Sequence, residues 1–295
     1  MRLVRYSKAN TDYRLGITNG RAVRDISTID GVSATTMIDI ITDWEKVSTA
    51  LKDVVDFNIP LSDVQLHAPI ACPGKILGIG LNYAEHAEEG GAALPEDQMW
   101  FSKPATTVNG PYDPIKLPLA SDQLDYEVEL VAVIGKRCRH LGRAAAQDAI
   151  FGYCIGNDVS VRDWQLKTTQ VFLGKSFDTH APFGPWITTA DAFDPTDAAL
   201  SCHVNGEQRQ RSRTSKMVFD CADQVAHLSQ VMTLEPGDII FTGTPSGVGA
   251  LMTPPAWLVE GDRVRCEIEG LGMIENVVEA EVKGDTVATA AGRRH

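Results

Sequence analysis

The sequence predicts a mostly β protein with helical decoration, an α+β fold, in which a small N-terminal α/β unit precedes a larger domain. From Pro69 onward, short segments of strand character alternate with turn residues. Helical periodicity is clear in few places, and two Asn-Gly dipeptides separate strand-like segments. The 295 residues, 43% of them hydrophobic, are enough to bury a large core. We expect residues 1–66 to form the small unit, residues 67–283 the main domain and residues 284–295 a disordered tail.

The N-terminal unit is predicted to begin as a β-hairpin. Residues 13–17 and 21–26 flank Asn19-Gly20, a favoured two-residue turn. A short helix should follow, capped by Thr42 or Asp43, because the next apolar residues recur at helical spacing. This pattern indicates a lid or docking unit more than a catalytic one.

The main domain is predicted to contain at least six strands and two helices. The strands are 76–80, 126–134, 153–157, 202–204, 239–242 and 264–268. The helices are 144–150 and 221–232. Asn205-Gly206 indicates a second hairpin, and Gly237-Asp238 and Gly261-Asp262 each form a turn that leads into a strand.

Charge and hydropathy exclude several classes of partner. A net charge of −12 and a pI near 5.0 argue against nucleic acid or an anionic membrane, which would repel the protein. The sequence contains no apolar run of transmembrane length and begins without a signal-like segment, so we expect a cytoplasmic protein. The six cysteines lack metal or redox spacing and should be reduced, mostly buried thiols.

Glu127 and Glu129 are the strongest candidates for a functional site. They lie two residues apart at the start of an apolar strand, so their side chains project from the same face. Two buried carboxylates side by side cost free energy unless a cation neutralises them or one is protonated. The alternative is that both face solvent on an edge strand.

Asp158 adds a third hard oxygen ligand at the end of another apolar segment. Three carboxylates without a nearby Cys or His ligand pair suit Mg²⁺ or Mn²⁺ and suit Zn²⁺ poorly. Such a site leaves positions for water or a chelating substrate. Alternatively, Asp158 caps the turn that follows it.

His86 and Glu89 are a candidate general-base pair. On a helical turn, three-residue spacing places them on one face, where the carboxylate can orient the imidazole. The alternative is a solvated acidic turn before Gly90-Gly91.

Arg162, Gln165 and Lys175 form a polar cluster shortly after Asp158. Lys175 has apolar neighbours, so its ammonium either snorkels to solvent or faces an anion. The glycine-rich loop 241–249 lacks a phosphate-loop lysine and a nucleophile-elbow serine. It could still bind a carboxylate through backbone amides and the hydroxyl of Thr242 or Thr244.

Several separated motifs resemble the fumarylacetoacetate hydrolase family and occur in that family's order. They are Gly80-Leu81-Asn82-Tyr83 with His86, Asp125 to Glu129 with Gly135-Lys136-Arg137, Gly152-Tyr153 with Asn157-Asp158-Val159-Ser160 and Arg162-Asp163, Gly174-Lys175-Ser176-Phe177, and Thr242-Gly243-Thr244-Pro245 with Gly247-Val248-Gly249. The likeness covers about residues 69–280. It implies a mixed β-roll fold and a homodimer.

The resemblance also implies roles for the candidate residues. Glu127, Glu129 and Asp158 would bind the metal, while His86 and Glu89 would form a dyad on a lid. The pocket lining implied by the resemblance comprises Arg162, Gln165, Lys175 and Thr244, with Lys175 taking part in catalysis.

Members of this family hydrolyse 1,3-diketo acids, decarboxylate oxaloacetate-like acids, or isomerise hydroxymuconate-type acids. The chain most resembles the shorter bacterial branch that cleaves acylpyruvates or 2,4-dioxo acids, because Met252-Thr253-Pro254-Pro255 and Leu258 are similar there. We therefore expect hydrolysis of a carbon–carbon bond in a small 2-oxo acid, with Mg²⁺ or Mn²⁺ as cofactor. The alternatives are decarboxylation or isomerisation in the same pocket, or a non-catalytic carboxylate-binding protein.

Overall fold

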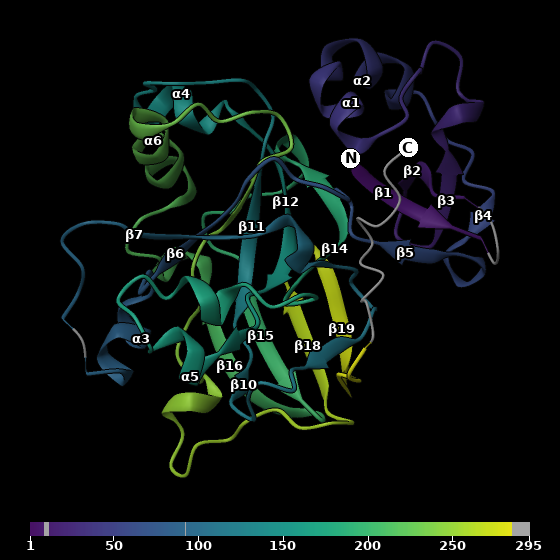
Figure 1. Ribbon diagram of the computed structural model, residues 1–295. Helices are drawn as coiled ribbons and strands as arrows, with labels where there is room; N and C mark the ends of the chain where they lie inside the picture. Colours follow the sequence, from purple (N-terminus) through teal and green to yellow (C-terminus); the bar gives the residue numbers. More distant parts are fainter. Residues whose placement is uncertain (9–11, 92, 285–295) are drawn as a thin grey trace.

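A mixed sheet of 12 strands organises the computed structural model, which describes residues 1–8, 12–91 and 93–284 (Figure 1). In spatial order its path is β4 (Ile59–Pro60), β3 (Ala22–Asp25), β2 (Arg14–Thr18), β1 (Arg2–Ser7), β14 (Ala181–Thr189), β12 (Ile150–Asn157), β11 (Val128–Ile134), β17 (Ile239–Phe241), β6 (Ile76–Gly80) and β7 (Met99–Lys103). Off this path, β5 (Gln65–His67) pairs with β1, and β8 (Val108–Asn109) pairs with β14. The predicted tail lies outside the described residues except for Gly284.

A five-stranded sheet packs against this large sheet. Its order is β16 (Glu207–Arg213), β15 (Ala199–Val204), β18 (Arg263–Ile268), β19 (Gly272–Ala280) and β9 (Ile115–Leu117). A separate ladder joins β10 (Leu124–Asp125) and β13 (Ser160–Val161). The predicted mostly β class is confirmed, as are the hairpins at Asn19-Gly20 and Asn205-Gly206.

The two faces of β11 enter different hydrophobic cores. Val128, Leu130 and Ala132 face the core shared with β15 and β18, whereas Val131 and Val133 face the core that includes the N-terminal helices. Because both faces are buried, every residue of β11 except Glu129 is apolar. Side chains alternate along a strand, so Glu129 projects from the same face of β11 as Val131, opposite the face that packs against β15 and β18.

The N-terminal residues extend the large sheet, because β1 pairs with β14 in antiparallel fashion. Two helices follow, α1 (Met37–Thr42) and α2 (Trp44–Lys52), where the sequence predicted one. Thr36 and Asp39 form a capping box that starts α1. Asp43 precedes α2 as predicted, but its side chain makes no capping hydrogen bond.

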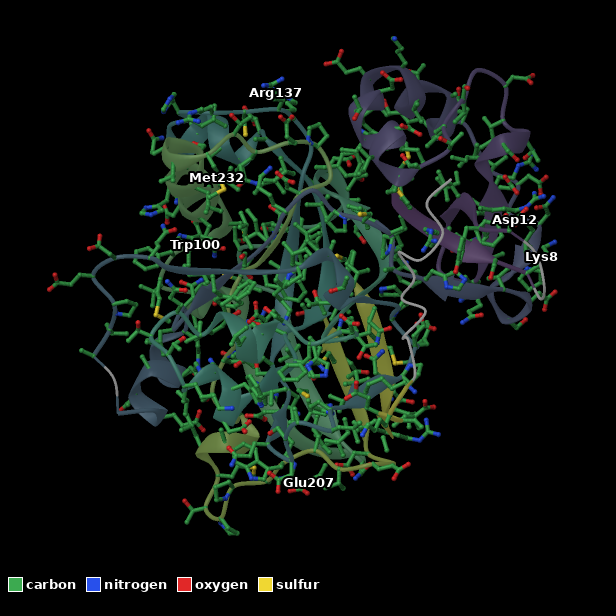
Figure 2. All side chains as sticks on the ribbon, viewed as in Figure 1. Lys8, Asp12, Trp100, Arg137, Glu207 and Met232 are labelled. Atoms are coloured by element: carbon green, nitrogen blue, oxygen red, sulfur yellow. The ribbon has the colours of Figure 1, made fainter. Side chains whose placement is uncertain are left out.

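Four further α-helices follow after residue 67 in the described part of the chain. They are α3 (Ala84–Glu89), α4 (Arg143–Gln147), α5 (Arg162–Gln165) and α6 (Cys221–Val231). Short 3-10 helices lie at Ile26–Thr28, Leu61–Asp63, Ala105–Thr107, Phe172–Lys175, Ala190–Ala192, Thr214–Lys216 and Gly249–Leu251. Trp100 and Met232, labelled in Figure 2, pack at the margin of the main core. In the ranges described above, none of the helices has the length and apolar character needed to cross a membrane.

Candidate active site

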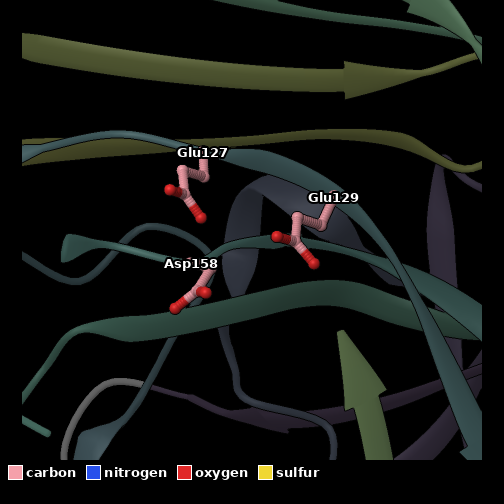
Figure 3. Close-up of side chains that lie close together, drawn as sticks. All are labelled: Glu127, Glu129 and Asp158. Carbon is pink, nitrogen blue, oxygen red and sulfur yellow. The ribbon is translucent and has the colours of Figure 1, made fainter. Parts of the chain in front are cut away.

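Glu127, Glu129 and Asp158 lie together at one end of the paired strands β11 and β12. Glu127 directly precedes β11, Glu129 is the second residue of β11, and Asp158 directly follows β12. One carboxylate oxygen from each lies within 4.8 Å of the others, and Figure 3 shows the three groups around a common space. All three side chains are buried. The arrangement therefore excludes the solvent-facing edge strand that the sequence left open.

Three buried cations surround these carboxylates. Lys175 Nζ donates to Glu127 Oε2 and to Asp158 Oδ2, both at 2.7 Å. Arg162 Nη1 lies 2.7 Å from Glu127 Oε1, and Lys103 Nζ lies 2.5 Å from Asp158 Oδ1. The Lys175 ammonium thus faces two anions and does not reach solvent.

The surroundings of Glu127 and Glu129 shift their pKa values in opposite directions. Burial alone would raise the pKa of Glu127, but Lys175 and Arg162 lower it to about 2. For Glu129, burial and the like charges of Asp158 and Glu127 raise the pKa well above its ordinary value. In the described part of the chain, Glu129 forms no ion pair with a cationic side chain and accepts a hydrogen bond from Gly243 N–H at 2.7 Å.

The donor set fits a divalent cation. Within the described residues, the buried carboxylate of Glu129 has no cationic side chain as an ion-pair partner. Two further carboxylates lie beside it and could bind the same metal ion. The cluster contains oxygen donors alone, with neither Cys nor His, which favours Mg²⁺ or Mn²⁺. Residues Glu127, Glu129 and Asp158 could hold such an ion.

Arg162 links the carboxylate cluster to the polar groups predicted from the sequence. Its Nε donates to Asp125 Oδ2 at 2.8 Å and its Nη1 to Gln165 Oε1 at 2.8 Å. Arg162 Nη2 is buried and has no hydrogen-bond partner within the described residues. An unpaired buried donor is costly, so this atom is suited to the carboxylate of a ligand.

Gly174 allows the segment that carries Lys175 to approach α5. A Cβ atom at Gly174 would lie only 2.3 Å from the backbone nitrogen of Gln165. A side chain here would therefore push Lys175 and Gln165 apart.

His86 and Glu89 lie on α3, so the predicted helical turn is confirmed. His86 Nδ1 is 3.4 Å from Glu89 Oε2, a long contact for a hydrogen bond. Both Glu89 oxygens also accept from Gly247 N–H at 3.0 Å, which ties α3 to the glycine-rich loop. The side chain of His86 is 13% exposed and that of Glu89 is 26% exposed, while residues 88–91 are exposed as whole residues, so the role of the pair as a general base stays a prediction.

Thr244 holds the glycine-rich loop against the start of β11. Its Oγ1 donates to Val128 O at 3.0 Å and accepts from Gln210 Nε2 at 2.8 Å. Gln210, which the sequence did not indicate, also accepts from Val128 N–H at 2.9 Å. The Thr244 hydroxyl already donates its proton to Val128 O, so the expected contact of Thr244 with substrate stays a prediction.

Lys103 is the second site residue absent from the sequence-based predictions. It ends β7 and is fully buried beside Asp158. A lysine closing an aromatic strand at Met99–Lys103 is the signal that could have identified it, because a buried lysine requires an anionic partner.

Metal affinity should rise with pH. The metal-free site favours a proton on Glu129, whose pKa is raised, and a metal ligand must be deprotonated. We expect the Mn²⁺ dissociation constant to fall as pH rises above the ordinary Glu pKa of 4.5, with proton release on binding. Calorimetry in buffers of different ionisation enthalpy measures both quantities. A pH-independent constant without proton release would contradict this assignment.

Comparison with known proteins identifies the family. Residues 75–279 match the model described as fumarylacetoacetate (FAA) hydrolase C-terminal. A fumarylacetoacetate hydrolase domain-containing protein 2 homolog of Dictyostelium discoideum is 45% identical over 80% of this chain and 81% of its own length. A mitochondrial oxaloacetate tautomerase of Rattus norvegicus is 40% identical over 94% of this chain and 91% of its own length.

A solved structure agrees with this relationship. Maleylpyruvate hydrolase from Sphingobium sp. SYK-6, in complex with manganese(II) and pyruvate, has a TM-score of 0.81 and 36% identity. The match covers 96% of this chain and all of that one. The fold, the motif order and these matches agree: the chain belongs to the fumarylacetoacetate hydrolase family.

Proposed function

We propose that this chain is a divalent-metal-dependent enzyme that interconverts the keto and enol forms of oxaloacetate or a closely related 2-oxo diacid. The observation that carries the proposal is the cluster of three buried carboxylates enclosed by three buried cations. The carboxylates suit a hard divalent ion, and the cations suit the anionic substrate bound to it. The rat relative named as an oxaloacetate tautomerase, which aligns over nearly the whole chain, supports this choice of reaction.

The site residues would have separate roles in binding the metal and the substrate. Glu127, Glu129 and Asp158 would hold Mg²⁺ or Mn²⁺, which as a Lewis acid stabilises the negative charge that develops on the C2 oxygen. Arg162, with its free Nη2, and Gln165 would bind the substrate carboxylate. Lys175 would supply further positive charge to the reacting end.

His86 would move the proton. In the keto-to-enol direction the imidazole accepts a proton from C3, the electron pair of that C–H bond forms the C2–C3 double bond, and the carbonyl π electrons move onto the C2 oxygen. The imidazolium then returns the proton to the C2 oxygen, which completes the enol and regenerates the neutral base. Glu89 would orient the imidazole, and Gly247 N–H fixes Glu89 in turn.

Hydrolysis of an acylpyruvate, the reaction expected from the sequence, is the second candidate. The His86–Glu89 pair favours it, because such a pair could deprotonate a water that attacks the distal carbonyl. The maleylpyruvate hydrolase structure supports the same choice. The products would be pyruvate and a carboxylic acid.

One set of assays separates these reactions. Enol-oxaloacetate is followed by ultraviolet absorbance with enzyme, with EDTA, and after Mn²⁺ is restored, while pyruvate formation from oxaloacetate and from acetylpyruvate is measured in parallel. We expect faster approach to the keto–enol equilibrium, lost with EDTA and regained with Mn²⁺. Metal-dependent pyruvate release from acetylpyruvate without tautomerase activity would replace the first proposal with hydrolysis, and pyruvate release from oxaloacetate alone would indicate a decarboxylase.

A further inference from the structure

Strand β7 supplies the candidate site with two side chains. Phe101 and Lys103 lie two residues apart and therefore share one face of the strand. The Phe101 ring lies 5.0 Å from Lys175 Nζ and occupies the space left by Gly78. Lys103 Nζ donates to Asp158 Oδ1 at 2.5 Å and to Val159 O at 3.3 Å. β7 is thus part of the wall of the site.

Both oxygens of Asp158 accept from lysines. Lys103 occupies Oδ1 and Lys175 occupies Oδ2. A metal ion bound to Asp158 must therefore share this carboxylate with at least one ammonium group. The two lysines oppose the ion electrostatically even as they fix the orientation of its ligand.

The formal charge of the site shows what Lys103 contributes. The buried charged groups around the site are Asp125, Glu127, Glu129 and Asp158 with Lys103, Arg162 and Lys175. With all four carboxylates ionised, as they are when an ion is bound, four negative and three positive groups give −1, and the divalent ion changes this to +1. Without the charge of Lys103, the same count gives −2 before the ion is added and a neutral loaded site.

We propose that Lys103 is a positioning residue that weakens binding of the divalent ion and strengthens binding of the anionic 2-oxo acid. It holds Asp158 in place and leaves the loaded site positive. The part that concerns the 2-oxo acid rests on the proposed function, whereas the part that concerns the metal stands on the geometry alone. A neutral side chain at this position would reverse both effects.

The test uses Lys103→Met, which keeps most of the side-chain volume and removes the charge. Calorimetric titration with Mn²⁺, and then with pyruvate at saturating Mn²⁺, measures the two affinities without turnover. We expect Mn²⁺ to bind about 10-fold more tightly and pyruvate about 10-fold more weakly, because removal of one positive charge a few ångströms away changes each interaction by on the order of 1 kcal/mol or more at an effective dielectric constant of about 20. The Mn²⁺-induced rise in melting temperature should also be larger than in the unmodified protein.

Lys75→Met is the matched control. Lys75 Nζ pairs with the buried Asp238 at 2.7 Å, outside the site. This variant should lose stability through the same kind of change and leave both affinities unaltered. Lys103→Gln keeps a hydrogen-bond donor without the charge, and it should behave like Lys103→Met.

Two results would overturn the proposal. If Mn²⁺ binds more weakly to both Lys103 variants, the lysine acts only as a support for Asp158. If pyruvate affinity is unchanged, Lys103 has no part in attracting the anion. Both measurements are independent of tautomerase activity, so failure of the proposed reaction and failure of this inference are distinguishable.

Discussion

Glu127→Gln and Glu129→Gln should each reduce turnover at least ~100-fold, yet change the stability of the metal-free protein in opposite directions. Groups around metal ligands already cost about 10- to 100-fold when they are altered, so loss of a ligand charge should cost more. Both variants should therefore lose the rise in melting temperature that Mn²⁺ causes in the unmodified protein.

The opposite effects on stability follow from the two pKa shifts. The pKa of Glu127 is lowered to about 2, so its stabilisation is present above pH 4.5 and is lost as pH falls toward 2. At neutral pH its removal should cost on the order of 3 kcal/mol, because Lys175 and Arg162 lose a partner. The pKa of Glu129 is raised, so a carboxyl group at this position destabilises the metal-free fold at neutral pH, and Gln should increase the melting temperature.

Glu279→Gln is a suitable control, because Glu279 is exposed and pairs with Lys116 away from the site. It should leave metal binding and stability nearly unchanged. Unaltered Mn²⁺ dependence in either of the two site variants would be incompatible with the ligand assignment.

His86→Ala should lower tautomerisation at least ~100-fold while metal affinity and melting temperature stay close to those of the unmodified protein. Loss of a general base typically costs ~10²- to 10⁴-fold. Hydrolysis of an acylpyruvate should fall by a similar factor, since it requires an activated water. Decarboxylation of oxaloacetate should survive, because it needs mainly the metal as an electron sink. Steady-state rates with all three substrates, together with Mn²⁺ titration, provide the comparison.

Glu89→Gln tests the same proton transfer with a smaller expected effect than His86→Ala. It disturbs the orientation of the imidazole and the contact with Gly247 N–H without deleting the base, so the loss of rate should be smaller. Full tautomerase activity in His86→Ala would assign the proton transfer to another group. If His86→Ala instead lost decarboxylation and kept hydrolysis, the water-activating role would also be wrong.

Local patterns in the sequence were sufficient to place the carboxylates. The two-residue spacing of Glu127 and Glu129 predicts a shared face, and the structure brings both next to Asp158. Turn chemistry predicted where β17 and β18 begin, because Gly237-Asp238 and Gly261-Asp262 directly precede them. These features depend on neighbours along the chain.

Features that depend on pairing between distant strands were not predictable in this way. β14 is a fully buried central strand, but Pro182, Gly184 and Pro185 interrupt its strand pattern. Lys103 reaches Asp158 only because β7 pairs with β6, which pairs with β17 beside β11. The ligand roles and the independence of the N-terminal unit stay predictions.

Crystals grown with Mn²⁺ and examined by anomalous diffraction would test the metal site most directly. The account predicts one strong anomalous peak bound by an oxygen from each of Glu127, Glu129 and Asp158, at about 2.0–2.3 Å. It also predicts that this peak disappears in Glu129→Gln crystals grown in the same way. Absence of a peak between these carboxylates in the unmodified protein at saturating Mn²⁺, or a peak held by other residues, would contradict the account.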